Sequence, residues 1–372
     1  MRTRRLREAI TIVAVGMAVA TAGDVRGSEV FGYEEWQEAV RARQLDPADV
    51  IYPFHATEEM RQWATERLRL HMTLEASKKL EVLQQALFDS DEFEFAYQDA
   101  VTLTGEQAFL ARHGNCLAFT SMFVALSRSV GIPTFLVKVR RAPEVERDNT
   151  VVVVNRHVVA GYRTATDMAL YDFYFTSATP YMQHWVIDDV QASAMFHNNL
   201  GGEAIRDDDL TTAVHHLDIA TRLDPGWAPG WVNLGVARFR LGDNDGAMAA
   251  YERALEVEPG NSSALSNISV LHLQQGREEE ARTALKAASE GRANPFILIA
   301  MADMEMTRGN FDAAERYLRR ARWWYRDEPE VFDAMARLAR KRGDLQQANE
   351  HAAEAAALRR DRSGTGVDAP MG

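Results

Sequence analysis

Residues 231–259 read WVNLGVARFRLGDNDGAMAAYERALEVEP, and the pattern of this stretch recurs through the second half of the chain. One alanine returns at spacings of 34, 34, 33 and 34 residues, and in four units a glycine precedes it by five residues. Small residues let paired helices approach closely, and a glycine suits the turn between them. The sequence therefore predicts an array of helix pairs. The alanines are Ala213, Ala247, Ala281, Ala314 and Ala348, and the glycines are Gly242, Gly276, Gly309 and Gly343.

This pattern resembles the tetratricopeptide repeat. The stretch carries Trp231, Gly235 and Tyr251 at the spacing of that family. It departs from the family at Arg238, where an aromatic residue is expected. We predict about five such units over residues 191–362, a count that agrees with the number of repeated alanines.

The resemblance implies a superhelix whose concave face binds a protein or peptide partner, unless that face packs against the N-terminal half. The run RRARWWYR at 319–326 is basic and aromatic. We expect it to end a repeat helix, with Trp323 and Trp324 buried against the next unit, and not to bind nucleic acid. A disordered tail is predicted at 363–372. The first-helix positions expected on the partner-binding face are Val232, Val236, Phe239, Val270, Leu273, Ile299 and Met306.

The N-terminal segment has the three parts of a secretory signal peptide. Residues 2–7 are basic, residues 9–22 are apolar, and Ala20-Thr21-Ala22 fits a cleavage site with small residues. We therefore predict a signal peptide over 1–22, cleaved near Ala22, and an exported protein, most simply in a bacterial periplasm. The alternative is an uncleaved membrane anchor, although the apolar stretch is short for a span.

Composition excludes several classes of protein. The chain has 372 residues, 46% of them hydrophobic, which is typical of a globular chain that forms a core. Its formal net charge of −12 disfavours nucleic-acid binding, because that requires a basic face. Cys116 is the one cysteine, so no internal disulfide or multi-cysteine metal site can form. The adjacent His215 and His216 point to different faces of a helix, which disfavours a metal site formed by this pair. We predict no metal and no organic cofactor. No membrane contact beyond the signal segment is expected, and the oligomeric state stays open.

The residues that could perform chemistry lie in the first half. The stretch GNCLAFTSMFVALSRSVGIP (114–133) has a helical apolar face, and Asn115 is a natural N-cap that makes Cys116 the first helical residue. A helix N-terminus favours a thiolate and offers a backbone N–H to an oxyanion. Three strand-like runs follow, with His157 inside the second and Asp172 inside the third. The runs are 134–139, 150–162 and 169–175.

Residues of this part of the chain resemble the transglutaminase-like superfamily, a branch of the papain-like cysteine fold. Cys116, His157 and Asp172 match the family's order of helix, strand and strand, although the residues after the histidine depart from its pattern. The resemblance implies that the cysteine attacks, the histidine transfers protons and the aspartate orients the imidazole. Asp167 or Asp188 could replace Asp172.

The oxyanion in such a site needs two hydrogen-bond donors. The backbone N–H of Cys116 is one candidate donor. Gln98 and Tyr97, which precede the helix, are the weaker candidates for the second donor.

The predicted architecture is an α+β transglutaminase-like domain over 29–190, followed by an all-α tetratricopeptide superhelix. The predicted function is that of an exported, thiol-dependent acyl transferase or hydrolase that acts on a peptide or amide bond, as a peptidase, amidase or transamidase. The repeats would recruit a protein partner or substrate. The alternative is a non-catalytic adaptor that binds proteins through its repeats and carries a degenerate triad, or a peptide-binding cleft without turnover.

Overall fold

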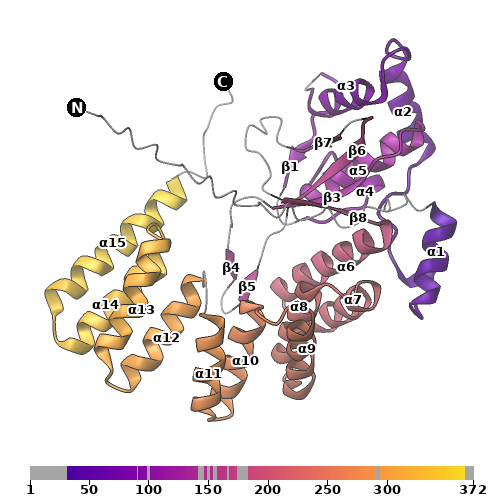
Figure 1. Ribbon diagram of the computed structural model, residues 1–372. Helices are drawn as coiled ribbons and strands as arrows, with labels where there is room; N and C mark the ends of the chain where they lie inside the picture. The colour runs from indigo at the N-terminus through magenta and orange to yellow at the C-terminus, as the bar shows by residue number, and fades with distance from the viewer. Residues whose placement is uncertain are drawn as a thin grey trace, which may run out of the picture.

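A computed structural model describes residues 32–89, 91–98, 101–140, 146–148, 151–153, 157–165, 167–173, 183–289 and 294–364. It contains small sheets among helices, followed by a long run of helix pairs (Figure 1). This order confirms the predicted fold class, an α+β part followed by an all-α superhelix. The predicted signal peptide lies outside the described residues, as does most of the predicted tail.

The segment before the first long strand is mostly helical. Thr57 caps one of its helices by accepting a hydrogen bond from the N–H of Met60 at 3.2 Å. Another begins with a capping box between Thr104 and Gln107. The helices are α1 (Tyr33–Ala42), the short 3₁₀ helix η1 (Pro47–Asp49), α2 (Glu58–Leu68), α3 (Ala76–Phe88), α4 (Gly105–Ala111) and α5 (Cys116–Ser129).

The central sheet is antiparallel, with the strand order β7-β6-β3-β8. The predicted run 134–139 corresponds to β3, whereas the run 150–162 contains two separate strands, β5 and β6. The sequence did not predict β8 or the two-residue parallel pair of β1 and β2. The strands are β1 (Ala96–Tyr97), β2 (His113–Gly114), β3 (Phe135–Arg140), β4 (Glu146–Asp148), β5 (Val151–Val153), β6 (His157–Arg163), β7 (Met168–Tyr171) and β8 (Gln183–Ile187).

Helix α5 packs against β6 and forms the centre of the first hydrophobic core. Phe119 and Phe123 on this helix are completely buried, and Val158 of β6 lies in the same core. The core also takes in Phe196, which belongs to the first helix after the sheet. The apolar packing therefore continues across the boundary predicted near residue 190.

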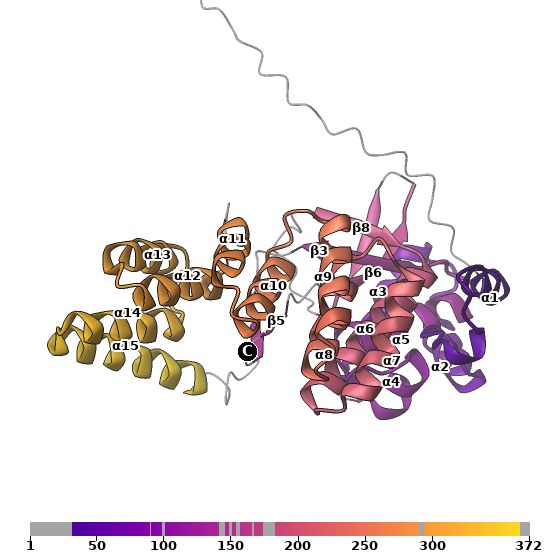
Figure 2. The ribbon, with the colours of Figure 1, turned by 90° about the horizontal axis from the view of Figure 1, so that it is seen from below.

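The second half consists of five helix pairs that stack side by side (Figures 1 and 2). The repeated alanines are at most 1% exposed, as close helix packing requires. The four repeated glycines have φ between 71° and 83°, and Asp208 takes the equivalent place in the first pair with φ 59°. The pairs are α6 (Asp189–Arg206) with α7 (Leu210–Leu223), α8 (Ala228–Arg240) with α9 (Asn244–Val257), α10 (Ser262–Gln274) with α11 (Glu278–Ala288), α12 (Pro295–Thr307) with α13 (Phe311–Trp324), and α14 (Pro329–Arg342) with α15 (Leu345–Gly364).

Close packing inside the array explains why the best-matching unit needs a glycine. A side chain at Gly235 would place its Cβ 2.3 Å from the ring of Tyr251, a separation that real Cβ atoms do not reach. The glycine of α8 therefore makes room for the tyrosine of α9, whose ring is 1% exposed.

The structure corrects the predicted partner-binding face. Four of its seven residues are at most 7% exposed and belong to the hydrophobic clusters inside the array. Such residues stabilise the stacking of helices and are not open to a partner. Phe239 and Val270 are half-buried, and Leu273 is 43% exposed. The four buried residues are Val232, Val236, Ile299 and Met306.

The prediction that Trp323 and Trp324 are buried was wrong. Trp323 is 68% exposed and Trp324 is 46% exposed. The face of α13 that packs into the core carries Ala314, Leu318 and Ala321, which recur three and four residues apart. The two tryptophans lie beside that face, in the last turn of the helix.

The N-terminal segment is fastened to the first helix pair. Trp36 is completely buried in a cluster with Val190 of α6, and its indole N–H donates to the hydroxyl of Ser193 at 3.1 Å. Arg128, in the last turn of α5, makes a bidentate ion pair with the buried Asp189 of α6 at 2.7 and 2.9 Å. The helix that begins with Cys116 is thereby anchored at its far end to the repeats. Within the described part of the chain, no helix has the length and apolar character needed to cross a membrane.

Candidate active site

Cys116 is held at the first position of α5, as the sequence predicted. The side chain of Asn115 accepts a hydrogen bond from the N–H of Ala118 at 3.0 Å, and its amide group donates to the hydroxyl of Thr102 at 2.8 Å. Cys116 is half-buried. Because it is the first helical residue, its N–H has no acceptor within the helix and can serve a ligand.

A short parallel strand pair brings both predicted second oxyanion donors close to the cysteine. Tyr97 of β1 is paired with Gly114 of β2, and the N–H of Gln98 donates to the carbonyl of Gly114 at 3.0 Å. Both residues are exposed, and the Tyr97 ring packs against Phe173 with centroids 4.8 Å apart. Gly114 has φ +155°, and a Cβ there would lie 2.5 Å from that of Ala118. The close approach of chain and helix in front of Cys116 thus requires glycine.

His157 and Asp172 are in direct contact. His157 is the first residue of β6, so it lies on a strand as predicted, whereas Asp172 directly follows the last residue of β7 and lies just outside its predicted strand. His157 Nε2 is 2.7 Å from Asp172 Oδ1, and the aspartate is 4% exposed. The alternatives to Asp172 are engaged elsewhere. Asp167 accepts from the N–H of Met168, and Asp188 caps α6.

The surroundings of His157 favour its charged form. Burial opposes the charge, but hydrogen bonds to Asp172 and to Cys116, together with the charges of both groups, outweigh burial and raise the pKa of His157 to about 9. Nε2 faces the carboxylate, so Nδ1 is the nitrogen left for the sulfur. The three side chains therefore form one line of contacts, from Cys116 through His157 to Asp172.

Two further side chains fix this arrangement, and sequence reasoning missed both. The amide of Gln84 on α3 donates to the backbone carbonyl of Asp172 at 2.6 Å. The hydroxyl of Thr120 donates to the carbonyl of Cys116 at 2.7 Å and lies 3.3 Å from that of Val158, next to His157. A signal for Gln84 was present, because it is a polar residue in the apolar stripe of a helix and needs a buried partner.

A second histidine pair lies outside this site. His197 of α6 and His216 of α7 face each other with their Nδ1 atoms 3.0 Å apart, and the N–H of Ile51 donates to His197 Nε2 at 3.1 Å. Burial and the neighbouring His216 and His215 lower the pKa of His197 to about 3. Over the described residues, no three histidine, cysteine, aspartate or glutamate side chains are grouped so that they could hold a metal ion.

Comparison with known families identifies both halves of the chain. The model of the family described as cilia and flagella-associated protein 70 C-terminal domain matches residues 172–369, which is more than half of the 372 residues. The chain belongs to this family. The model of the transglutaminase-like superfamily matches residues 67–186, the segment that contains Cys116, His157 and Asp172. The protein therefore combines a transglutaminase-like domain with C-terminal tetratricopeptide repeats.

Individual relatives match over shorter segments. The human PEX5-related protein is 30% identical over 86 residues, which are 23% of this chain and 14% of that protein. The chloroplastic tetratricopeptide repeat domain-containing protein PYG7 of Arabidopsis thaliana is 27% identical over 154 residues, 39% of this chain and 51% of that protein. The heat shock protein sti1 homologue of Schizosaccharomyces pombe is 29% identical over 135 residues, 36% of this chain and 19% of that protein. The chain thus spans about half or less of these relatives.

Solved structures resemble the chain over less than half of its length. Pseudomonas aeruginosa PilF covers 44% of this chain and 76% of its own, at 22% identity and a TM-score of 0.40. The type IV pilus biogenesis factor PilW covers 44% of this chain and 77% of its own, at 21% identity and a TM-score of 0.39.

Proposed function

We propose that this protein is a thiol-dependent acyl transferase or hydrolase that acts on a peptide or amide bond. The observation that supports the proposal is the line of contacts from Cys116 through His157 to the buried Asp172. A nucleophile, a proton carrier and an orienting carboxylate are the three groups that such chemistry needs. The match to the transglutaminase-like superfamily is consistent with this chemistry.

In the first half of the reaction, Cys116 Sγ attacks the carbonyl carbon of the substrate. The raised pKa of His157 means that the imidazole holds a proton at neutral pH. The thiolate is the nucleophilic form of a cysteine, and an adjacent imidazolium favours it. The N–H of Cys116 stabilises the oxyanion, with Gln98 or Tyr97 as second donor. The C–N bond then breaks, His157 passes its proton to the leaving amine, and the acyl group remains on sulfur as a thioester.

In the second half, the acceptor attacks the thioester carbonyl carbon. His157 accepts a proton from the incoming water or amine, and the C–S bond breaks to restore the thiolate and imidazolium. Asp172 holds the imidazole orientation throughout and compensates its positive charge. Water as acceptor gives a hydrolase, and an amine gives a transamidase.

We propose that the repeats recruit a protein partner or a polypeptide substrate to this site. Stacked helix pairs provide an extended surface, which is the form that binding surfaces of repeat proteins take. The exposed Trp323 and Trp324 support the proposal, because tryptophan is enriched at protein interfaces. We also propose a location outside the cytoplasm, which the predicted signal peptide over residues 1–22 supports.

The test is the rate at which iodoacetamide alkylates Cys116 as a function of pH. We expect wild type to react rapidly down to about pH 6, because the thiolate is paired with His157, and His157→Ala to react up to about 100-fold more slowly there. His184→Ala is the matched control, since His184 is an exposed histidine of the same sheet, and it should react like wild type.

The opposite result is equally informative. A thiol that reacts only above about pH 8.5, like an unperturbed cysteine, and that ignores the removal of His157 would refute the proposed chemistry. The protein would then be an adaptor that acts through its repeats.

A further inference from the structure

The repeat array has a break between its third and fourth helix pairs. Its apolar packing divides within α11, because Ala284 belongs to one hydrophobic cluster and Leu285 to the next. Arginine side chains span the junction instead. Arg282 of α11 donates to Glu305 of α12 at 3.3 Å, and Arg320 of α13 donates to the carbonyl of Ser289 at 2.9 Å.

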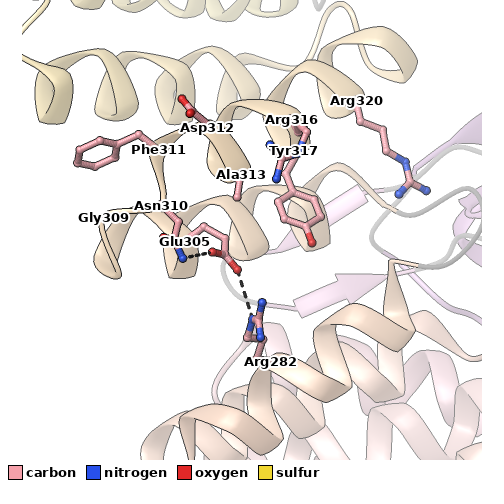
Figure 3. A pocket seen from close by; sticks show the side chains of 10 residues that line it. All are labelled: Arg282, Glu305, Gly309, Asn310, Phe311, Asp312, Ala313, Arg316, Tyr317 and Arg320. Carbon is pink, nitrogen blue, oxygen red and sulfur yellow. Dashed lines mark hydrogen bonds and ion pairs between the residues drawn. The ribbon is translucent and has the colours of Figure 1, made fainter.

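A cavity of about 830 Å³ opens at this junction. Its walls come from α11, from the end of α12 and from the first turns of α13 (Figure 3). The cavity is open to solvent, and its lining is polar and rich in arginine. The residues that matter for its chemistry are Arg282, Glu305, Asn310, Arg316, Tyr317 and Arg320.

The acidic groups of the cavity are already engaged. Glu305 is 3% exposed, and its two carboxylate oxygens accept hydrogen bonds from Arg282 and, at 2.8 Å, from the amide of Asn310 (Figure 3). Asp312 is turned away from these groups and accepts from Arg342 at 2.9 Å (Figure 3). The charge that the cavity offers to a ligand is therefore positive.

Arg316 carries the positive charge of the cavity that is available to a ligand. Its side chain is exposed, and the described residues provide it with no ion pair or hydrogen bond. Most other arginines of the outer repeats are engaged, as the pairs Arg337–Asp303 and Arg342–Glu315 illustrate. Because Arg316 also lines the cavity, its guanidinium is in a position to pair with an external anion there.

The positive stripe continues out of the cavity to exposed aromatic residues. Arg316, Arg320 and Trp323 follow one another at intervals of four and three residues, so they lie on one face of α13. Trp323 is 68% exposed, an unusual exposure for the largest apolar side chain. The surface thus joins two guanidinium groups to an apolar ring.

We propose that this cavity and stripe bind an acidic peptide segment of a partner protein. Carboxylate side chains of the peptide pair with Arg316 and Arg320, because the planar guanidinium matches a carboxylate with two parallel hydrogen bonds. An apolar side chain of the peptide packs on Trp323. The site lies between α11 and α13, the second helices of two pairs, and it reaches the end of the first helix α12. The inference rests on the proposed recruiting role of the repeats and specifies the chemistry of the partner.

A short peptide fits these observations better than a nucleic acid. The basic stripe extends over less than three turns of one helix, and the buried Glu305 and the overall charge of −12 would repel a long polyanion. The site therefore suits a segment with a few carboxylates and at least one apolar residue.

The experiment measures peptide binding by fluorescence anisotropy, using the full chain with Cys116→Ala so that no turnover occurs. The probes are a labelled ten-residue peptide of glutamates around one phenylalanine, and the same peptide with glutamine in place of glutamate. We expect the acidic peptide to bind at least about tenfold more tightly, with an affinity that falls as salt rises.

The decisive variants are Arg316→Glu and its matched control Arg319→Glu. Both residues are exposed arginines of α13, but only Arg316 lines the cavity. Arg316→Glu should weaken the acidic peptide at least about tenfold, whereas Arg319→Glu should stay within about twofold of the parent. Trp323→Ala should also weaken binding, and all variants should unfold at the temperature of the parent.

Several outcomes would overturn the proposal. These are no binding of the acidic peptide, equal binding of the acidic and glutamine peptides, equal losses in the two arginine variants, and tighter binding of a single-stranded oligonucleotide of the same length. None of these outcomes affects the alkylation of Cys116, so a failure of this proposal is distinguishable from a failure of the proposed acyl-transfer chemistry.

Discussion

Two histidines in this molecule, the half-buried His157 and the buried His197, have pKa values that are shifted in opposite directions. His157, at the start of β6, has its pKa raised to about 9, whereas His197, on α6, has its pKa lowered to about 3. Burial disfavours the charged imidazole in both places. The difference lies in the partners. His157 contacts the carboxylate of Asp172, while His197 contacts a second histidine and a backbone N–H.

Hydrogen-bond polarity explains why the two partner sets act in opposite directions. When both ring nitrogens of His157 carry a proton, one N–H donates to the carboxylate of Asp172 and the other donates to the sulfur of Cys116. At His197, the N–H of Ile51 already donates to Nε2, so a second ring proton would face a donor. One site is therefore built to hold a proton and the other to exclude it. This contrast supports the assignment of proton transfer to His157 and of a structural role to His197.

The largest effect should appear in acid and should depend on His197. Below about pH 6.5 the unfolded chain gains a proton at this residue that the folded chain refuses, so the free energy of unfolding should fall by about 1.4 kcal/mol per pH unit from this residue alone. His197→Gln should remove that part of the slope, so that wild type loses about 3 kcal/mol more than the variant between about pH 6.5 and 4.5. Urea denaturation at several pH values in this range measures the free energy of unfolding, with His184→Gln, at an exposed histidine, as control. If the free energy of unfolding depends on pH equally in wild type and in His197→Gln, His197 does not stay neutral in the folded chain.

The next largest effect is a loss of stability as the pH rises, and it depends on Asp172. The folded chain holds the proton of His157 up to about pH 9, whereas the unfolded chain loses it near pH 6.5. His157 therefore adds up to about 3 kcal/mol to the free energy of unfolding below about pH 6.5, and this contribution is lost by about pH 9. Asp172→Asn should lower the pKa of His157 by about 1 to 3 units and flatten this slope. NMR titration of the imidazole measures the shift, and Asp167→Asn should leave it unchanged. An unaltered titration in Asp172→Asn would mean that the carboxylate does not hold the proton.

The smallest effect is expected when His197 is given a carboxylate partner like that of His157. His216→Asp places a carboxylate opposite His197 Nδ1, and we expect the pKa of His197 to rise by about 1 unit or more, because an opposite charge now partly offsets burial. The same NMR titration reads the shift. His215→Asp, on a side chain that is exposed, should change it less. If the two substitutions act equally, overall charge would govern His197 and the facing partner would not.

The sequence predicted the helical start of the site more accurately than its strands. Asn115 and Cys116 are neighbours in the chain, and a cap with its first helical residue is a local arrangement that residue type largely determines. His157 lies on a strand, as predicted, but Asp172 falls one residue beyond the end of its strand, because strand ends depend on pairing with distant segments such as β6. Gln84 escaped notice for the same reason, since its partner lies 88 residues away.

The repeat array shows the same division between local and distant information. Repeated alanines and glycines predict helix pairs directly, because they allow close packing and a tight turn between two helices that are adjacent in sequence. Which faces stay open depends on the neighbouring pair. Val232 and Val236 were expected to meet a partner and are buried, whereas Trp323 was expected to be buried and is exposed. The stacking of each pair on the next decides these exposures.

The sequence by itself determined the order of the two halves, the spacing of the helix pairs and the position of Cys116 at a helix start. These features follow from backbone preferences and from side-chain periodicity, which act over a few residues. Only the tertiary structure decided that Asp172 faces His157, that His197 is kept neutral and that Arg316 borders a cavity. Charge and burial act through space, so the protonation state of a histidine or the availability of an arginine is fixed by whatever the fold places next to it.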